Sequence, residues 1–476
     1  MRKSKALALL LPWLAAACAA GPAYERPPEP STAAGPFVTQ GGGFDAAAAL
    51  PDDWWRLYDD PALNALIARA FAANTDLRVA SANLAKARAV LQEARAGRLP
   101  STSVTGGVSY GDASQGGTGQ GGSAGDAQWS ENAGLALSWE VDLFGRVGRS
   151  IEAARADTEA VEAARDAVRV TVAAETTRAY LNACAYSYAL DVARESLRTS
   201  DENLRLVTAQ ERAGSVGKLD VERAGAATAA ARAAIPALER QRQAALFELA
   251  ALLGATPDGV PQAARACSAP PEPAAILPVG DGAALLRRRP DLREAERRLA
   301  ADIARIGVAT ADLYPRISLG GSGNFYRSDT VRGGDSFSFS LGPLLSWSFP
   351  NVSVARARIR QAEAQGDASL AAFDGKVVTA LKEVEQALAG VATEQDRLDA
   401  LREAQERSER AYRFADLRYR AGSIGYLDVL VAQADLLSAR ASYASSLQQL
   451  SSARIDLFKA LGGGWRDSET VGSEGP

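Results

Sequence analysis

Arg212-Ala-Gly-Ser-Val-Gly-Lys-Leu-Asp220 returns as Arg420-Ala-Gly-Ser-Ile-Gly-Tyr-Leu-Asp428, with seven of nine positions identical and an offset of 208 residues. Each copy ends a stretch able to form helix, so the repeat indicates an internal duplication. The stretch before the first copy, residues 149–213, has 65 residues without Gly or Pro, enough for a helix of roughly 98 Å. We therefore predict an elongated, mainly α-helical chain.

Landmarks around the nonapeptide define two copies of one unit. Asp76-Leu77-Arg78 corresponds to Asp291-Leu292-Arg293 at an offset of 215, and Trp139 corresponds to Trp347 at 208. Each copy reads helix, β-hairpin, long helix, tight turn and returning helix. The predicted parts are a signal peptide at 1–17, a leader at 18–60, a first repeat at 61–254, a linker at 255–289, a second repeat at 290–462 and a tail at 463–476.

Two segments in each repeat change from helical periodicity to alternation, which predicts strands. The first hairpin, 101–143, pairs 101–110 with 133–143, where Leu, Trp and Val share one face. The second hairpin, 316–349, pairs 316–326 with 336–349, the latter interrupted at Pro343. An open sheet edge cannot be satisfied in lipid, and four strands are too few for a barrel. Three copies of the chain would supply twelve strands.

The N-terminus predicts export. Residues 1–17 have a basic start and an apolar stretch before three alanines, which is typical of a secretory signal. Cys18 follows and resembles the lipidated cysteine of bacterial lipoproteins, and Ala19 behind it implies sorting to the outer membrane. Ala15 stands where such signals usually carry Leu, so cleavage by the ordinary signal peptidase is the alternative.

Two cysteines remain in an oxidising compartment. Cys184 precedes the first nonapeptide by about 30 residues, and Cys267 follows the segment that returns from it. A helical hairpin would bring both to a similar height. They either form a disulfide or remain two buried thiols.

The composition argues against enzymes, metal sites and nucleic acid. Without the signal peptide the chain has 50 basic and 57 acidic side chains, a balance that does not favour nucleic acid. There is no His to serve as a base, so the Gly121–Gly125 match to a nucleophile elbow is accidental. One Met and no cysteine cluster give little support for a soft metal. We predict no catalytic residue, no metal site and no cofactor.

Five motifs spread over the mature chain carry a family resemblance. They are Asp53-Trp54-Trp55 with Asp60-Pro61, Arg288-Arg289-Pro290-Asp291, Ile306-Gly307-Val308-Ala309 with Leu313-Tyr314-Pro315, Arg418-Tyr419-Arg420-Ala421-Gly422, and Lys459-Ala460-Leu461-Gly462-Gly463-Gly464-Trp465. With them the chain resembles the TolC-like outer-membrane factors, especially the NodT-like lipoprotein branch. The resemblance implies a homotrimer whose twelve-stranded β-barrel in the outer membrane continues into a periplasmic α-helical barrel. It also implies a periplasmic adaptor and an inner-membrane efflux pump as partners, with outer-membrane lipid around the barrel.

The two turns are candidate docking sites. We expect Gly214, Gly217, Gly422 and Gly425 to reverse the chain by adopting positive φ, and Asp220 and Asp428 to cap the returning helices. A turn that only reverses the chain is the simpler interpretation. The resemblance implies that the tips contact the adaptor, with Ser215 and Ser423 beside the glycines.

A gate is predicted before the second turn. TolC-like channels are closed near this end by polar rings around the axis, so Asp416 with Arg413 or Arg420 is the candidate latch. Ordinary surface pairs on a coiled coil are the alternative.

The sequence thus predicts a passive exit channel of a tripartite efflux system in the outer membrane of a Gram-negative bacterium. The alternative is a structural or adhesive envelope lipoprotein made of periplasmic coiled coil. The alternating strands favour the channel, because a scaffold does not need outward Leu, Trp and Phe.

Overall fold

The computed structural model of the chain describes residues 20–28, 33–39, 43–48, 50–111, 127–273, 276–329 and 331–465. The predicted signal peptide, Cys18, most of the first hairpin loop and most of the tail lie outside these ranges. The chain forms two compact units. The first contains residues up to 27, 83–162 and 294–374, and the second contains residues 28–82, 163–293 and 375 onward.

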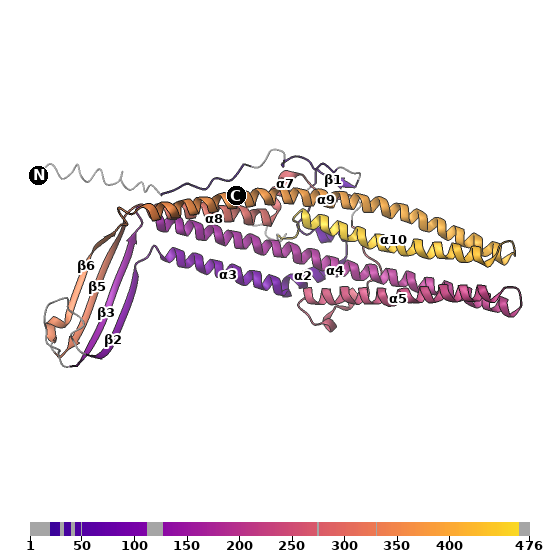
Figure 1. The fold of residues 1–476 in the computed structure, drawn as a ribbon, viewed down its shortest axis with the longest axis horizontal. Helices are drawn as coiled ribbons and strands as arrows, with labels where there is room; N and C mark the ends of the chain where they lie inside the picture. The colour runs from indigo at the N-terminus through magenta and orange to yellow at the C-terminus, as the bar shows by residue number, and fades with distance from the viewer. Residues whose placement is uncertain are drawn as a thin grey trace. The chain divides into compact units, whose positions relative to one another are not determined.

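Helices dominate the fold and repeat in length (Figure 1). The long helices α4 and α9 have 67 and 68 residues, and the returning helices α5 and α10 have 35 each. This agreement in length is what the duplication predicts. The main helices are α2 (Pro61–Ala73), α3 (Thr75–Ala96), α4 (Arg146–Arg212), α5 (Lys218–Leu252), α7 (Gly282–Arg288), α8 (Pro290–Ala311), α9 (Ser353–Arg420) and α10 (Tyr426–Ala460).

Local sequence explains where several helices begin. Asp60 accepts hydrogen bonds from the backbone N–H groups of Ala62 and Leu63, and Pro61 takes the first helical position of α2. Asp281 caps α7 in the same way. Asp142 accepts hydrogen bonds from the backbone N–H groups of Val147 and Gly148 at the start of α4. Capping carboxylates therefore fix where the chain enters these three helices.

The first unit contains a four-stranded antiparallel sheet in the order β2-β3-β5-β6, with β2 and β6 at its edges (Figure 1). The same hydrogen bond occurs twice at the end of the sheet where β2 and β5 begin, which we call the foot of the sheet. The indole N–H of Trp139 donates to the carbonyl of Arg98, and that of Trp347 donates to the carbonyl of Leu313. Each acceptor lies two residues before a proline, Pro100 or Pro315, that is followed directly by β2 or β5. The strands are β2 (Ser101–Gly111), β3 (Gln128–Val141), β5 (Arg316–Ser328) and β6 (Phe337–Ser346).

The structure corrects three details of the predicted strands. β3 begins at Gln128, five residues earlier than predicted. β6 runs through Pro343, which pairs with Leu319; a residue without an N–H is tolerated there because β6 is at the edge of the sheet that one chain forms. β6 ends at Ser346, so Trp347 and Phe349 lie beyond it, with their rings stacked 4.7 Å apart.

In the second unit, three of the sequence motifs converge on one joint. The buried indole of Trp54 lies 4.7 Å from the ring of Phe458 in α10, and a side chain at Gly463 would collide with it. Arg289 donates to the carbonyl of Ala460 and forms a two-point ion pair with Asp291. The indole N–H of Trp465 donates to the carbonyl of Arg288. The Asp-Trp-Trp, Arg-Arg-Pro-Asp and Gly-Gly-Gly-Trp motifs are therefore one packing arrangement.

Short segments join the leader to the linker in the same unit. β1 (Phe44–Asp45) pairs in parallel with β4 (Leu277–Pro278), which the sequence analysis did not predict. The backbone N–H groups of Val38 and Thr39 donate to the carboxylate of Glu385 in α9. The remaining short elements of the described residues are η1 (Trp54–Tyr58), η3 (Pro257–Gly259), α6 (Gln262–Arg265) and η4 (Gly333–Ser336).

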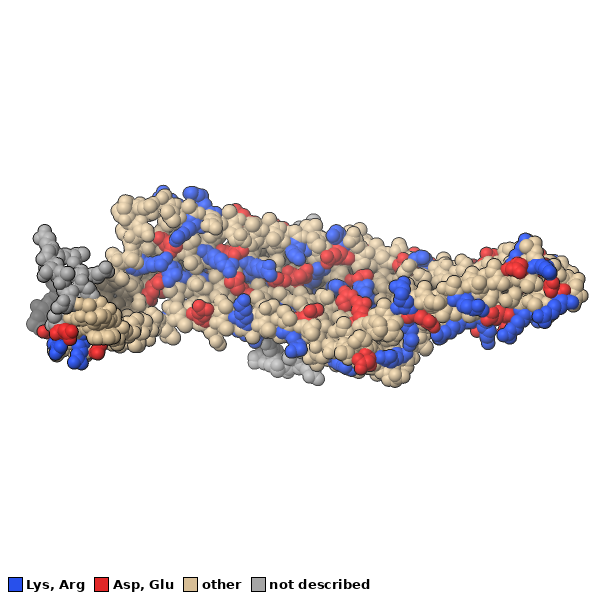
Figure 2. Space-filling view, turned by 60° about the horizontal axis from the view of Figure 1, so that its bottom comes forward, with Lys and Arg blue, Asp and Glu red and all other residues tan. Residues whose placement is uncertain are grey.

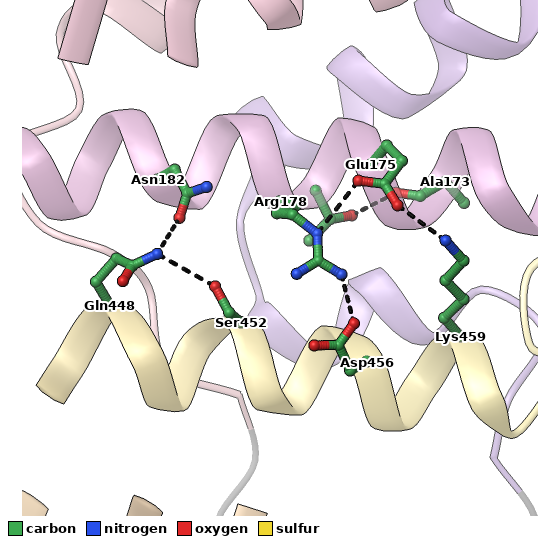
Figure 3. Close-up of polar contacts among 9 residues, drawn as sticks. Ala173, Glu175, Arg178, Asn182, Gln448, Ser452, Asp456 and Lys459 are labelled. Atoms are coloured by element: carbon green, nitrogen blue, oxygen red, sulfur yellow. Dashed lines mark hydrogen bonds and ion pairs between the residues drawn. The ribbon is translucent and has the colours of Figure 1, made fainter. Parts of the chain in front are cut away.

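Polar contacts also tie the first repeat to the second through α4 and α10 (Figure 3). Glu175 accepts from Lys459 at 2.9 Å and from Arg178 at 3.2 Å, and Arg178 also donates to Asp456 at 2.7 Å. Burial disfavours the charged form of Glu175, but the hydrogen bonds from Lys459 and Arg178 outweigh it, so its pKa lies below the ordinary value. One helical turn or more away, Gln448 donates to Asn182.

Candidate functional site

The two tips have the same backbone structure, bond for bond. Gly214 has φ +77° and Gly422 has φ +73°. The next residue in each tip, Ser215 or Ser423, donates its backbone N–H to the carbonyl five residues back, that of Gln210 or Arg418. Each serine hydroxyl donates to the same carbonyl, at 2.9 and 3.0 Å. Both long helices therefore end in a Schellman turn that only glycine fits without strain.

Two expectations about the tips were wrong. Gly217 and Gly425 have φ −90° and −80°, because each occupies the extended N-cap position of the returning helix and does not reverse the chain. Asp220 and Asp428 do not cap these helices, since they lie inside the first turn. Their charges still lie at the positive end of the helix dipole.

The predicted docking residues form an exposed surface at each tip. Gly214, Ser215, Gly217, Gly422, Ser423, Gly425 and Asp428 are exposed, and Asp220 is half-buried. The copies differ where Lys218 corresponds to Tyr426. Lys218 is exposed, whereas Tyr426 is 5% exposed and packs 5.6 Å from Tyr419. Burial raises the pKa of Tyr426 to about 12, so it stays neutral.

Near the two tips, a buried amide network joins the helical hairpin of α4 and α5 to that of α9 and α10. The Asn203 amide donates to Gln433 at 2.6 Å and to the hydroxyl of Tyr412 at 3.1 Å. Gln433, 2% exposed, donates in turn to Ser200 at 2.8 Å. Burial raises the pKa of Tyr412, which keeps its hydroxyl neutral in this network. Every member is uncharged and partnered, so the network joins the helices without burying a charge.

A second tyrosine repeats this contact one heptad nearer the tip. Tyr419 donates to the side chain of Gln210, and both residues lie seven positions after Tyr412 and Asn203. α4 and α9 are therefore joined by two successive tyrosine–amide contacts, one every two turns. Sequence reasoning missed Asn203, Gln210 and Gln433. The heptad spacing of Asn203 with Gln210 on α4, and of Tyr412 with Tyr419 on α9, was a signal for the contacts between these two helices.

The predicted gate residues lie on the last turns of α9. Arg420 Nε donates to Asp416 at 3.0 Å, an i,i+4 pair whose carboxylate is the less exposed partner. Arg413 is exposed and forms no ion pair within the described part of the chain. Phe414 and Leu417 lie among these charged residues on the same helix and are 64% and 62% exposed. The pairing of Asp416 with Arg420 is thus intrahelical in the single chain.

The two faces of the sheet differ sharply in chemistry. Directly paired residues share a face and successive residues alternate. One row across the four strands is Val104, Leu135, Gly323 and Phe339, and the next row, on the opposite face, is Ser103, Ala136, Ser322 and Ser340. Phe337, Phe339 and Leu341 on the apolar face are 70%, 89% and 79% exposed. An apolar face this exposed calls for a covering that the described residues do not provide.

Cys184 and Cys267 form a disulfide in the structure. Cys184 is fully buried in α4, and Cys267 lies two residues after α6, so the bond fixes the inter-repeat linker to the first long helix. Cys18, the predicted lipidation site, lies outside the described residues.

The charged side chains show no second kind of site. Acidic and basic residues are interspersed along the helices (Figure 2). The described ranges contain no group of three or more His, Cys, Asp or Glu arranged to hold a metal ion. Among the helices in those ranges, none combines the length and the hydropathy that crossing a bilayer requires.

Comparisons with known proteins agree with this architecture. A sequence model described as outer membrane efflux protein matches residues 66–255 and 283–463, two segments that correspond to the two repeats. Nodulation protein T of Rhizobium leguminosarum bv. viciae is 30% identical over 98% of this chain and 94% of its own length. The probable efflux pump outer membrane protein TtgC of Pseudomonas putida is 32% identical over 98% of this chain and 96% of its own length.

Solved structures extend the likeness to the fold. The outer-membrane channel OprN superposes with a TM-score of 0.85 at 35% identity, over 94% of this chain and 100% of that one. CusC, described with conformational changes that accompany folding and transmembrane channel formation, has a TM-score of 0.79 at 27% identity, over 93% of this chain and 99% of its own.

Proposed function

Because the chain belongs to the outer membrane efflux protein family, we propose that it is the outer-membrane channel of a tripartite efflux system in a Gram-negative bacterium. It is a passive duct for small molecules that an inner-membrane pump delivers through a periplasmic adaptor. The chain itself performs no chemistry. The observation that carries the proposal is the sheet with one apolar and one polar face.

The open edges of that sheet support a homotrimer. β2 and β6 lie at the edges of the described sheet and run antiparallel to each other, since three antiparallel pairings separate them. β6 of one copy can therefore pair with β2 of the next while the alternation of directions is kept. Three copies close a twelve-stranded barrel, with the apolar face toward lipid and the polar face toward the lumen.

The N-terminal arm supports a lipid anchor at the foot of this barrel. The backbone N–H of Ala20 donates to the carbonyl of Phe144, three residues after β3. Gly21 lies against Gly307 so closely that a side chain on either would collide with the other segment, which accounts for the Ile-Gly-Val-Ala motif. Cys18, the proposed site of the lipid anchor, stands two residues before Ala20 in the sequence.

We further propose that the two tips dock the adaptor and that α9 carries the gate. The docking candidates Gly214, Ser215, Gly422 and Ser423 are small and exposed, which suits close contact with another helix tip. For the gate, Asp416 is held by Arg420 while Arg413 remains available to a neighbouring copy's Asp416. Such a pairing across the axis removes the repulsion among three carboxylates.

The gate makes a specific prediction. Asp416→Ala removes the latch and should raise single-channel conductance of the trimer in planar bilayers. Asp399→Ala is the matched control, because Asp399 forms an exposed intrahelical pair with Arg402 on the same helix, farther from the tip. Equal conductance of the two variants would reject the latch while leaving the channel itself unaffected.

The proposed function is tested by two neighbouring cysteines on opposite faces of β6. Cys184 and Cys267 are bonded to each other, so an introduced Cys is a distinct reactive thiol among the described residues. In intact outer membranes, a membrane-impermeant thiol reagent should label Ser340→Cys through the lumen and lower the conductance of purified trimers. Leu341→Cys should be labelled only after detergent removes the lipid.

Three results would oppose the channel. Both variants could be labelled equally in intact membranes, the protein could run as a soluble rod without heat-modifiable trimers, or deletion of its gene could leave sensitivity to exported compounds unchanged. The first two would favour a periplasmic scaffold.

A further inference from the structure

The polar face of the sheet is almost free of charge. The four strands contain four charged residues, and Glu131 and Arg327 among them lie opposite each other on the apolar face. The other two, Glu140 and Arg316, are on the polar face at the foot of the sheet. Above them this face carries mainly Ser, Thr, Gly, Asn and Ala.

Several hydroxyl groups on this face are bonded to the wall itself. The hydroxyl groups of Ser322 and Ser340 lie 2.8 Å apart across β5 and β6, and those of Ser109 and Ser130 lie 2.9 Å apart across β2 and β3. Ser101 donates to the carbonyl of Ser138. A hydroxyl group that already hydrogen-bonds to the wall has less capacity to bind a passing molecule.

Most of the charges at the foot of the sheet are paired or used in capping. In the first repeat, Arg146 binds Glu140 through two nitrogen atoms, and Asp142 is used by the start of α4. In the second repeat, Asp312 pairs with Arg316 at 2.5 Å and with Arg358 at 3.5 Å. Together these are three carboxylates and three guanidinium groups.

The two repeats do not share the charged residues at the foot of the sheet. Asp312, Arg316 and Arg358 of the second repeat correspond to Gly97, Ser101 and Ser150 of the first, and Glu140, Asp142 and Arg146 correspond to Ser348, Pro350 and Val354. The two repeats use entirely different charged residues here. The first repeat contributes two carboxylates and one guanidinium, and the second contributes one carboxylate and two guanidinium groups, so the charges cancel only when the two repeats are combined.

We propose that the sheet part of the duct is an electrically neutral wall that passes cationic, anionic and uncharged compounds alike. This rests on the proposed function, because it takes the polar face as the lumen. The wall restricts size and offers weak hydrogen bonding, and charge selection belongs to other parts of the system.

The test adds charges of either sign at one lumen position. The charged variants are Ser322→Asp and Ser322→Lys, and Ser322→Asn is the neutral control. The reversal potential of each variant and of wild type is measured on single trimers in planar bilayers under a KCl gradient. In a neutral wall the two charged variants should shift the K⁺/Cl⁻ permeability ratio in opposite directions by similar factors, each about threefold. The Asn variant should leave the ratio unchanged.

The outcomes separate the inference from the function. Channels in which only one sign shifts the ratio, or neither does, would contradict a neutral wall, because fixed charge already present there would mask one of the additions. Absence of channels from the wild-type protein would instead reject the proposed function. If the Ser322 variants do not form trimers, the same pair of charges at Ser340, its hydrogen-bonded neighbour, gives the same readout.

Discussion

At the scale of single residues, the tips separate two glycines that look equivalent in the sequence. Gly422 reverses the chain with φ +73°, whereas Gly425, three residues later, has φ −80° and begins α10. No atom lies within 4 Å of where a side chain would be added at either position. Backbone conformation alone therefore distinguishes them.

The same substitution at both sites should have opposite effects. Gly422→Ser forces a left-handed conformation on a residue with a side chain and should cost about 1 kcal/mol of unfolding free energy. Gly425→Ser should be neutral or stabilising by a few tenths, since Ser is a good N-cap. Thermal unfolding midpoints of the two variants check this, with Gly214→Ser and Gly217→Ser as the repeat in the other tip. Equal midpoints for Gly422→Ser and Gly425→Ser would contradict the assignment.

At the scale of elements, the contact between α4 and α10 depends on pH. The pKa of Glu175 is lowered in the folded state because, although burial opposes its charge, Lys459 and Arg178 hydrogen-bond to it. A carboxyl with a depressed pKa stabilises the fold above its unfolded pKa, and this stabilisation is lost as the pH falls through the folded value. The contact should therefore weaken in acid.

Glu175→Gln tests this directly. At neutral pH the variant should unfold at a lower temperature than wild type, and the difference should shrink as the pH falls to about 3. Glu239→Gln is the control, because Glu239 pairs with Arg194 across α4 and α5 with both side chains more than half exposed. Unfolding midpoints that differ from wild type by the same amount at every pH would show that Glu175 acts through packing alone.

The elements also show what sequence reasoning could reach. Glycine-free length predicted α4 and alternation predicted both hairpins, because these are local properties, whereas α9, which contains three glycines, followed from the duplication. The role of Pro343 was mistaken, because a proline breaks a central strand but is accepted at an edge, and edge position is decided by the whole sheet. The pairing of β1 with β4 was missed, since two residues per strand leave no periodic signal.

At the scale of the whole molecule, the disulfide holds the link between repeats. Cys184 and Cys267 are 83 residues apart. In the chain-entropy account, closing a loop of that length raises the free energy of the unfolded chain by about 4–5 kcal/mol and so stabilises the fold. Reducing agent should therefore lower the unfolding temperature of wild type. A Cys184→Ala/Cys267→Ala variant should start lower and not respond to reductant. Wild type that is fully reduced yet melts unchanged would contradict this role.

Motifs that identified the family could not be assigned roles from the sequence. The two tryptophans of the leader, the arginines before α8 and the glycines after α10 lie far apart in the chain but meet at one joint. Their function is packing, and only the three-dimensional structure brings them together. The place of Gln433 in the amide network was missed for the same reason, because it lies on α10, whereas Asn203 and Tyr412 lie on α4 and α9.

The equal lengths of α5 and α10 have a consequence for recognition. Each is 35 residues long, so the two tips of a protomer are reached by the same number of helical turns. In the proposed trimer the rim then presents six projections of one length, although the chain supplies only three-fold symmetry. A partner ring would meet a geometric hexagon whose corners alternate in chemistry, one offering the exposed ammonium of Lys218 and the next hiding the ring of Tyr426. Insertion of one turn into both helices of a single hairpin, α4 with α5 or α9 with α10, would raise alternate corners by about 5.4 Å and reduce that hexagon to a triangle.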